Sequence, residues 1–316
     1  MKKEIIINAT LNELRLAITE DSRLAELFIE MPDKERSIGN VFLGRVSKVI
    51  PGINAAFIDI GTHQDAFLHF SDVDETLENM ITDEDDDEDD KSDPDFDDFI
   101  LPEVLDGGEE KSSHSDIALR KVKPKQSEKS LKKLAVFNTK RTGQVQINLE
   151  PGQWIVVQVV REAYGNKGVR VSTKVGIPGR YVVLIPFDSV IGISRKISAY
   201  PERKRLRFLA RTTLPKGAGC IIRTAAMGKS ELELQKDYES LIDIWTEIEN
   251  KVEKATEPML LYQDMAMATS VIRDLFTPEV KHVFIDSKKH YKEITNYLKW
   301  ASPHLMEKVQ LYTGKE

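Results

Sequence analysis

Two short stretches, AFIDI at residues 56–60 and AFLHF at residues 66–70, decide the fold of this chain. Alternate side chains of a β-strand point to opposite faces. If both stretches are strands, their aliphatic residues share one face, while Phe57 and Phe67 lie among polar neighbours on the other. Two rings on the polar face of adjacent strands suit the stacking of unpaired bases, worth about 1–3 kcal/mol per base. The alternative is a sandwich strand that is covered on both faces.

The residues before this pair favour a small barrel. Residues 39–52 have the sequence GNVFLGRVSKVIPG, and their glycines allow the tight coiling that an OB-fold barrel requires. Arg45 and Lys48 are expected near the aromatic face, where their charges suit phosphate groups. Together these segments look like the core of an S1-type RNA-binding domain. The pattern indicates an RNA-binding module and nothing more specific.

Length and composition limit the possible classes of protein. With 316 residues the chain has room for two or three domains, and 41% hydrophobic against 31% charged residues predicts a portion without a packed core. Its one cysteine, Cys220, excludes an intrachain disulfide and disfavours a cysteine-based zinc or iron–sulfur site within the chain. The N-terminal residues lack the features of a secretory signal, and no apolar run approaches the ~20 residues that span a bilayer. We therefore expect a soluble, cytoplasmic protein.

The net charge of −7 hides a strong separation of charge along the chain. Residues 71–110 hold 20 acidic side chains and one lysine, whereas residues 111–141 hold ten Lys/Arg and two acidic residues. The remainder therefore carries about +4, which is compatible with phosphate binding. We predict that residues 74–145 form an insertion in a surface loop of the barrel, since they cannot bury enough apolar surface to order. The insertion is either a solvated tether or an electrostatic arm that contacts RNA, and it is a candidate docking segment for a protein partner.

Hydrophobic periodicity predicts the remaining elements. Strands are expected at residues 5–10, 13–19, 23–30, 152–160, 169–173, 180–186, 190–194, 219–225 and 283–286, the first three as a meander. Helices are expected at residues 201–211, 230–255, 264–276 and 289–300, followed by a last helical stretch to about residue 312. Lys167 lies in a glycine-flanked turn, which suits either a phosphate contact or a plain hairpin tip.

The sequence lacks several common catalytic motifs. The segment GKS at residues 228–230 would need a glycine five positions before Gly228 to form a phosphate loop, and Arg223 stands there. The G-x-G-x-x-G, G-x-S-x-G and H-E-x-x-H patterns do not occur. No compact set of aspartates suggests a two-metal nuclease site, and we interpret Asp286 as structural.

Six segments, in a fixed order along the chain, carry a family resemblance. They are residues 7–10 (INAT), 51–69, 165–168 (GNKG), 192–195 (GISR), 222–225 (IRTA) and 311–314 (LYTG). On these segments the chain resembles the bacterial ribonuclease E/G family, most nearly its ribonuclease G members, over nearly everything outside the insertion. The resemblance implies an endoribonuclease of RNA processing, mRNA decay and rRNA maturation. Such an enzyme cuts single-stranded, AU-rich RNA and favours a 5′-monophosphorylated end.

The resemblance also implies an α+β, multidomain organisation. An RNase H-like portion, residues 1–37 and 269–316, would hold two insertions: an S1-type OB-fold domain at 38–171 and a 5′-sensor domain at 172–268. The family's DNase I-like domain, with its Mg²⁺-binding aspartates, and the Zn²⁺-binding cysteines that link protomers into oligomers are expected beyond residue 316. We therefore expect these residues to be the substrate-recognition half of a nuclease and nearly inert alone. The alternative is a naturally short, non-catalytic RNA-binding regulator.

The resemblance assigns roles to single residues. The RNA-contacting positions of the barrel would be Phe57, Phe67 and Lys167. The 5′-monophosphate pocket would comprise Arg223, Thr224, the supporting Arg195 and the backbone of Val183. A guanidinium fork beside a hydroxyl suits a terminal phosphate dianion. Two features depart from the family: Ile60 stands where an aromatic residue is common, and the charged insertion is not part of the common core.

Overall fold

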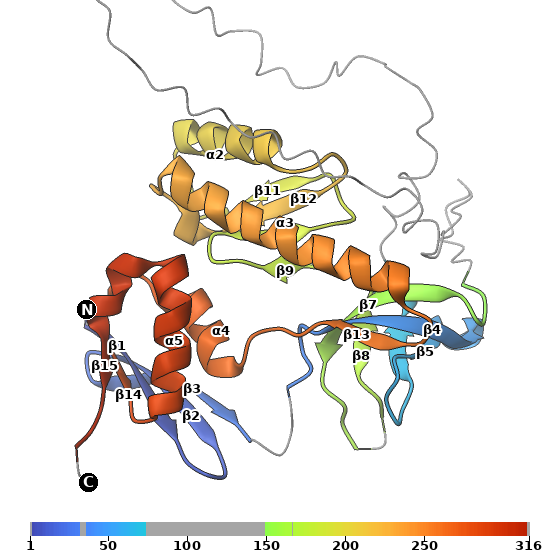
Figure 1. The fold of residues 1–316 in the computed structure, drawn as a ribbon, viewed down its shortest axis with the longest axis horizontal. Helices are drawn as coiled ribbons and strands as arrows, with labels where there is room; N and C mark the ends of the chain where they lie inside the picture. Colours follow the sequence, from blue (N-terminus) through green and yellow to red (C-terminus); the bar gives the residue numbers. More distant parts are fainter. Residues whose placement is uncertain (1, 32–35, 74–148, 166, 315–316) are drawn as a thin grey trace, which may run out of the picture.

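The computed structural model describes residues 2–31, 36–73, 149–165 and 167–314, so the predicted insertion at 74–145 lies outside the described residues. The described part is a mixed α+β structure with three hydrophobic cores (Figure 1). One core fills a small barrel, one lies under a five-stranded sheet, and one lies between a four-stranded sheet and two helices. None of the helices in these ranges is long and apolar enough to cross a membrane.

The barrel closes from five strands. They are β4 (Val41–Ile50), β5 (Ala55–Asp59), β6 (Ala66–His69), β7 (Trp154–Arg161) and β8 (Arg170–Ser172). The order is β4-β5-β6-β8-β7, and pairing of β7 with β4 closes the ring, as in an OB-like fold. The predicted strand pair is thereby confirmed. A sixth strand, β13 (Met259–Tyr262), adds to the edge of β4.

The inward faces of these strands explain the tight curvature of the barrel. Val46, Ile58 and Leu68 are buried there, as the alternation of the sequence predicted. Gly44 is needed because a Cβ atom at this position would lie 2.5 Å from Cγ2 of Ile58 and 2.9 Å from the carbonyl oxygen of Asp59. Because Gly44 has no side chain, β4 can pass close over β5 at this point. The register then shifts between Val46 and Lys48, which bends β4 around the barrel.

A five-stranded sheet forms the second part of the structure. Its strands are β1 (Lys3–Ala9), β2 (Leu14–Glu20), β3 (Arg23–Glu30), β14 (Val280–Ile285) and β15 (Val309–Leu311). The predicted meander β1-β2-β3 is antiparallel, and β14 and β15 add in parallel on the side of β1. Helices α4 (Met267–Leu275) and α5 (Lys288–Ala301) pack on one face (Figure 1).

The predicted last helical stretch is present only as a short 3₁₀ segment, and its predicted end at residue 312 is wrong. A 3₁₀ segment, η5 (Pro303–Lys308), follows α5, and residues Val309–Leu311 form β15. Pro303 lacks the N–H that would continue α5. Val309 is buried against the core beside Val283 of β14, so parallel pairing satisfies the backbone and hides an apolar side chain at once.

The third part is a four-stranded sheet with two helices. Its elements are β9 (Ile177–Pro178), β10 (Val182–Ile185), β11 (Ile191–Ile193), β12 (Gly219–Ile222), α2 (Tyr200–Thr213) and α3 (Glu231–Lys254). A capping box starts α3, because Ser230 and Glu233 bond reciprocally through side chain and backbone. The core beneath α3 also contains Val41 and Leu43 of the barrel, so the two parts share apolar packing.

Candidate nucleic-acid interface

The two phenylalanines of the quoted stretches lie side by side on the outside of the barrel. Phe57 of β5 and Phe67 of β6 are direct partners across the antiparallel pair, so their side chains project from the same face. Both rings are half-buried and neither belongs to the buried cores of the described residues. Their centroids are 5.9 Å apart with an edge-to-face angle of 73°. One ring therefore supports the other while both keep exposed surface.

Strand register extends this pair into a row of cations. Lys48 of β4 is the partner of Phe57, and Arg170 of β8 is the partner of Phe67. Arg161 of β7 is in turn the partner of Arg170. Register partners project from one face of a sheet. The face thus carries the order Lys48, Phe57, Phe67, Arg170 and Arg161, here called the aromatic row.

A carboxylate orients Arg170 of the aromatic row. Arg161 and Arg170 stand directly opposite, which is unfavourable for like charges. Asp72 offsets this repulsion, since its Oδ2 lies 2.7 Å from Nη2 and 2.8 Å from Nε of Arg170. The sequence reading did not identify Arg161 or Arg170. Only the register of distant strands brings them beside the rings.

The predicted contact Lys167 lies at a hairpin tip between β7 and β8. Its N–H donates to the carbonyl oxygen of Tyr164 at 3.1 Å, and the N–H of Tyr164 returns the bond at 3.2 Å. Gly168 sits against the carbonyl oxygen of Asp65, where any Cβ atom would clash. Lys167 is exposed and Tyr164 is 86% exposed beside it. The hairpin is therefore fixed at the loop that leads into β6, and the phosphate contact stays a prediction.

Arg45, also expected near the aromatic face, lies on the same outer face, because it is the register partner of Asp59, two residues along β5 from Phe57. Its Nε donates to the carbonyl oxygen of Gly152 at 3.0 Å, and its guanidinium lies 5.9 Å from the ring centroid of Trp154. This geometry is a cation–π contact on the surface. Arg45 therefore supports the barrel wall between β4 and β7, whereas Lys48 lies in the aromatic row.

The second candidate site surrounds Arg223 at the end of β12. Its backbone N–H donates to the carbonyl oxygen of Tyr181 at 2.8 Å. Its Nη1 donates to the carbonyl oxygen of Gly179 at 3.0 Å and to Oδ1 of Asp274 at 2.6 Å. No described residue accepts a hydrogen bond from its Nε or Nη2. One edge of the guanidinium is thus fixed by the protein, and the other edge remains available to a bidentate anion.

The structure brings together some of the other predicted pocket residues. Thr224 Oγ1 lies 2.8 Å from Ser194 Oγ, and Arg195, which follows Ser194 in the chain, is exposed. Val183 lies in β10, where its Cα is the register partner of Ile221. Among the described residues, no hydrogen bond joins Val183 or Arg195 to Arg223 or Thr224. The phosphate roles of these four residues stay predictions.

Asp274 of α4 links Arg223 to the neighbouring core. It also accepts from Arg273, whose Nε lies 3.1 Å from Oδ1 and whose Nη2 lies 3.3 Å from Oδ2. Burial raises the pKa of Asp274, but the hydrogen bond and charge of Arg273 and the charge of Arg223 outweigh it, leaving the pKa below its usual range. Asp274 is therefore an anion in the folded protein and holds Arg223 from one side.

A buried carboxylate shapes the turn that receives Arg223. Asp237 of α3 is 3% exposed and accepts from the N–H groups of Arg180, Tyr181 and Val182 at 3.0, 2.8 and 3.0 Å. Burial raises the pKa of Asp237, although these bonds and the charge of Arg223 oppose the shift. The sequence reading missed Asp237. Its signal was an acidic residue on the apolar stripe of a predicted helix.

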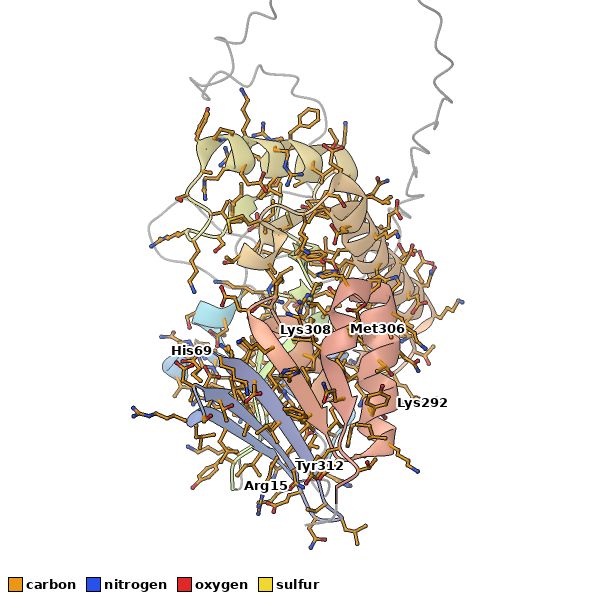
Figure 2. All side chains as sticks on the ribbon, turned by 90° about the vertical axis from the view of Figure 1, so that its left-hand side faces the viewer. Arg15, His69, Lys292, Met306, Lys308 and Tyr312 are labelled. Atoms are coloured by element: carbon orange, nitrogen blue, oxygen red, sulfur yellow. The ribbon has the colours of Figure 1, made fainter. Side chains whose placement is uncertain are left out.

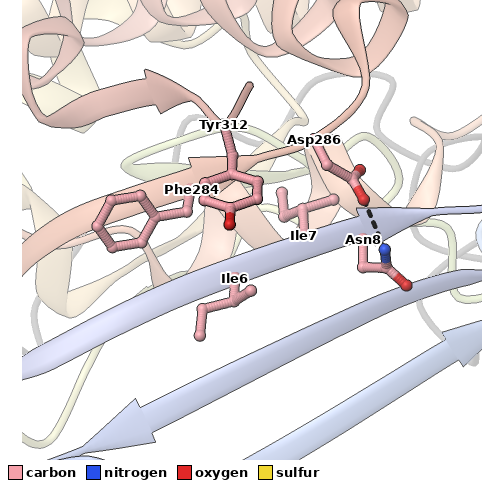
Figure 3. Close-up of a pocket in the computed structure, with 6 residues that line it drawn as sticks. All are labelled: Ile6, Ile7, Asn8, Phe284, Asp286 and Tyr312. Atoms are coloured by element: carbon pink, nitrogen blue, oxygen red, sulfur yellow. Dashed lines mark hydrogen bonds between the residues drawn. The ribbon is translucent and has the colours of Figure 1, made fainter. Parts of the chain in front are cut away.

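The uncovered face of the five-stranded sheet has a cavity of about 380 Å³ (Figure 3). It is lined by Ile6, Ile7, Asn8, Phe284, Asp286 and Tyr312. In Figure 2, Tyr312 lies toward the strands of this sheet, whereas Lys292 and Met306 lie on the helical side. Asp286 accepts from Nδ2 of Asn8 at 2.5 Å and from the N–H of Ala9 at 2.9 Å. Within the described ranges, no group of three potential metal ligands occurs.

This chain is similar in sequence to known proteins. Residues 176–316 match the model of the Ribonuclease E/G family, which includes the strand β12 and the Arg223 site. The chain carries a ribonuclease E/G family domain over residues 176–316. This finding confirms the family resemblance inferred from the sequence.

Individual relatives extend the match to the whole chain. Ribonuclease G of Haemophilus influenzae is 31% identical over 313 residues, which cover 99% of this chain and 53% of that protein. Ribonuclease G of Escherichia coli K12 is 30% identical over 318 residues, covering 100% of this chain and 54% of the relative. Ribonuclease E of Haemophilus influenzae is 28% identical over 315 residues. The chain thus spans about half the length of the ribonuclease G proteins it matches.

Proposed function

We propose that this chain binds single-stranded RNA and recognises its 5′-monophosphate. The observation that carries the proposal is the aromatic row, in which two rings outside the core are flanked by cations. Unpaired bases stack on exposed rings, and cations on either side follow the phosphate backbone. A row of this kind holds single strands with little sequence preference. Lys167 would add a contact at the hairpin beside β6.

The Arg223 site would supply the preference for the 5′ end. Its available guanidinium edge suits two oxygens of a terminal phosphate, and the Thr224 hydroxyl lies on the neighbouring residue. In this proposal Arg195 and the Val183 backbone complete the pocket. Asp274 holds the opposite edge of Arg223 and orients the fork.

The family match supports a wider proposal for the protein to which these residues belong. We infer an endoribonuclease of RNA processing and decay, including rRNA maturation, that uses Mg²⁺ for phosphodiester hydrolysis. The proposed architecture is an RNase H-like portion with an S1-type domain and a 5′-sensor domain inserted in it. Residues 1–316 would select the substrate, and the inferred protein would be a homo-oligomer linked by Zn²⁺.

Two variants separate the two proposed roles. RNAs that differ only in a 5′-monophosphate or 5′-hydroxyl are titrated against the wild type, Phe57→Ala and Arg223→Ala. Phe57→Ala should weaken both RNAs alike by about 5- to 150-fold, because the lost stacking serves either end. Arg223→Ala should weaken only the phosphorylated RNA.

The matched control is Phe284→Ala, which removes a half-buried ring from the other sheet. It should leave both affinities within about twofold. Equal losses for Phe57→Ala and Phe284→Ala would reject the aromatic row as the binding face.

A further inference from the structure

Arg180 is a buried cation in the turn between β9 and β10, next to the proposed 5′-end site. Its residue is 5% exposed. The guanidinium donates to three carbonyl oxygens at the C-terminal end of α4: from Nη1 to Ile272 at 2.9 Å and to Arg273 at 2.6 Å, and from Nη2 to Phe276. Among the described residues, Nε has no hydrogen-bond partner and the guanidinium forms no ion pair. Arg180 therefore links the turn to α4 from a position that solvent hardly reaches.

A buried arginine without a carboxylate partner is costly to the fold. Arginine is rarely buried to this extent unless its charge is paired, because removing a cation from water carries a large penalty. The negative end of the α4 dipole offsets part of that penalty, since the last carbonyl groups of a helix carry partial negative charge. The unpaired Nε adds to the cost. An apolar side chain could fill the same space without these costs, so the guanidinium points to a purpose beyond stability.

The two groups that hold Arg223 lie directly beside the two ends of this link. Nη1 of Arg223 donates to the carbonyl oxygen of Gly179 and to Oδ1 of Asp274. Gly179 immediately precedes Arg180 in the chain. Asp274 immediately follows Arg273, whose carbonyl oxygen accepts from Arg180. The bonds of Arg180 to α4 therefore set the separation of the two acceptors, and through them the position of the Arg223 guanidinium.

Other contacts fix each end of the link but join the two ends more weakly. The turn is held on α3, where Oδ1 of Asp237 accepts from the N–H of Arg180 at 3.0 Å. On α4, the carboxylate of Asp274 is held by Arg273. Arg273 also reaches across to the strand before the turn, from Nη1 to the carbonyl oxygen of Pro178, but at 3.4 Å this contact is long for a hydrogen bond. Arg180, with three bonds to α4, is the stronger connection.

We propose that Arg180 is a positioning residue for recognition of the 5′-monophosphate. The proposal rests on the proposed function above. Arg180 is too buried to touch the RNA, and it acts by keeping the end of α4 against the β9–β10 turn. Nε and Nη2 of Arg223 then meet two phosphate oxygens in a fixed orientation. A bidentate contact depends on this alignment, because both hydrogen bonds must be close to linear at the same time.

The test measures the ratio of the dissociation constants for 5′-hydroxyl and 5′-monophosphorylated RNA decamers of one sequence. Arg180→Gln removes the guanidinium and should lower this ratio by about 3- to 10-fold, as expected when one of two hydrogen bonds to a phosphate is lost. Affinity for the 5′-hydroxyl RNA should stay within about twofold, since the aromatic row holds that RNA. Arg180→Lys keeps the charge without the planar fork, so its ratio should lie between those of Arg180→Gln and the wild type.

The matched control separates positioning from stability alone. Leu298→Ala leaves a cavity in the core shared by α4 and α5 and lowers stability without removing any bond of Arg180. All variants are compared at a temperature where circular dichroism shows that each is folded. Leu298→Ala should keep the wild-type ratio within about twofold. An unchanged ratio in Arg180→Gln, or an equal loss in Leu298→Ala, would overturn the proposal. If Arg180→Gln does not fold, an unchanged ratio in Arg180→Lys overturns it instead.

Failure of the proposed function gives a different result. In that case the wild type itself binds both RNAs equally, and Arg223→Ala leaves the ratio unchanged. If the wild type prefers the 5′-monophosphate and Arg223→Ala removes this preference while Arg180→Gln does not, only the inference about Arg180 is rejected.

Discussion

Replacing Arg223 with alanine should remove most of the preference for a 5′-monophosphate. The structure leaves Nε and Nη2 as the edge that would hold two phosphate oxygens, because Nη1 is already bonded to Gly179 and Asp274. A hydrogen bond to a charged group contributes about 1.5–3 kcal/mol. The Arg223 side chain is one quarter exposed, so water weakens its hydrogen bonds to a phosphate. We therefore assign the about 1.5–3 kcal/mol to both hydrogen bonds together rather than to each. The preference should therefore fall by about 10- to 150-fold.

The loss should not arise from unfolding. Asp274 keeps its two contacts with Arg273 when Arg223 is removed, so no carboxylate is left without a partner. The free energy of unfolding should therefore fall by no more than about 1 kcal/mol. Arg223→Lys retains the charge but loses the planar fork, and its preference should lie between those of the wild type and Arg223→Ala.

The assay is fluorescence anisotropy with two 3′-labelled RNA decamers, one with a 5′-monophosphate and one with a 5′-hydroxyl. Arg15→Ala is the control, because Arg15 is exposed on β2 of the other sheet (Figure 2). It should leave the ratio of the two dissociation constants unchanged. If Arg223→Ala weakens both RNAs equally, or leaves the ratio at the wild-type value, Arg223 does not sense the 5′ end.

Three further predictions concern the hairpin beside the barrel, the turn beside Arg223 and an ion pair of helix α2. Gly168→Ala should lower the free energy of unfolding by about 1–3 kcal/mol, because the new Cβ atom would clash with the Asp65 carbonyl, whereas Gly52→Ala has open space and should be neutral in the same thermal melts. Asp237→Asn should cost about 1–3 kcal/mol for each backbone N–H that the amide leaves unpaired, and urea unfolding that shows no loss would contradict this. Glu202 has its pKa lowered from 4.5 to about 2, so its contribution to stability is present above pH 4.5 and is lost as the pH falls to about 2. The stability gap between the wild type and Glu202→Gln should therefore shrink over that interval, and a constant gap would refute the assignment.

Local patterns were sufficient for most of the elements. Period-two alternation predicted the meander and the strand pair that carries Phe57 and Phe67, since a one-residue shift would bury polar side chains. The apolar stripe alone located α3 to within a residue at its start. Three short strands escaped prediction, β9, β13 and β15, because two to four residues carry no reliable period.

Longer-range pairing explains what the sequence could not show. β15 is a three-residue parallel strand at a sheet edge. It forms only by pairing with residues of β14 that lie 26 positions earlier in the chain. In the same way, Arg170 reaches Phe67 only because β6 and β8 pair in parallel. Neither pairing leaves a local signal, since each is made by strands far apart in the chain.

The sequence named candidate residues for the two sites, whose roles stay predictions, but it did not name the residues that support them. The family resemblance pointed to Arg223 and Thr224, and the match over residues 176–316 includes both. It did not point to Asp274 or Asp237, which fix the guanidinium and the turn around it. Asp274 lies 51 positions after Arg223 and Asp237 lies 14 positions after it, on different helices. Only the fold brings the three residues together.

The most direct test of the account asks whether bases stack on the rings of the barrel. A single-stranded RNA that contains 2-aminopurine is bound to saturation by the wild type and by the double variant Phe57→Leu, Phe67→Leu, which keeps apolar side chains but removes both π faces. The account predicts that the emission of 2-aminopurine is quenched on binding to the wild type and stays high on the double variant. Equal quenching by both proteins would contradict it.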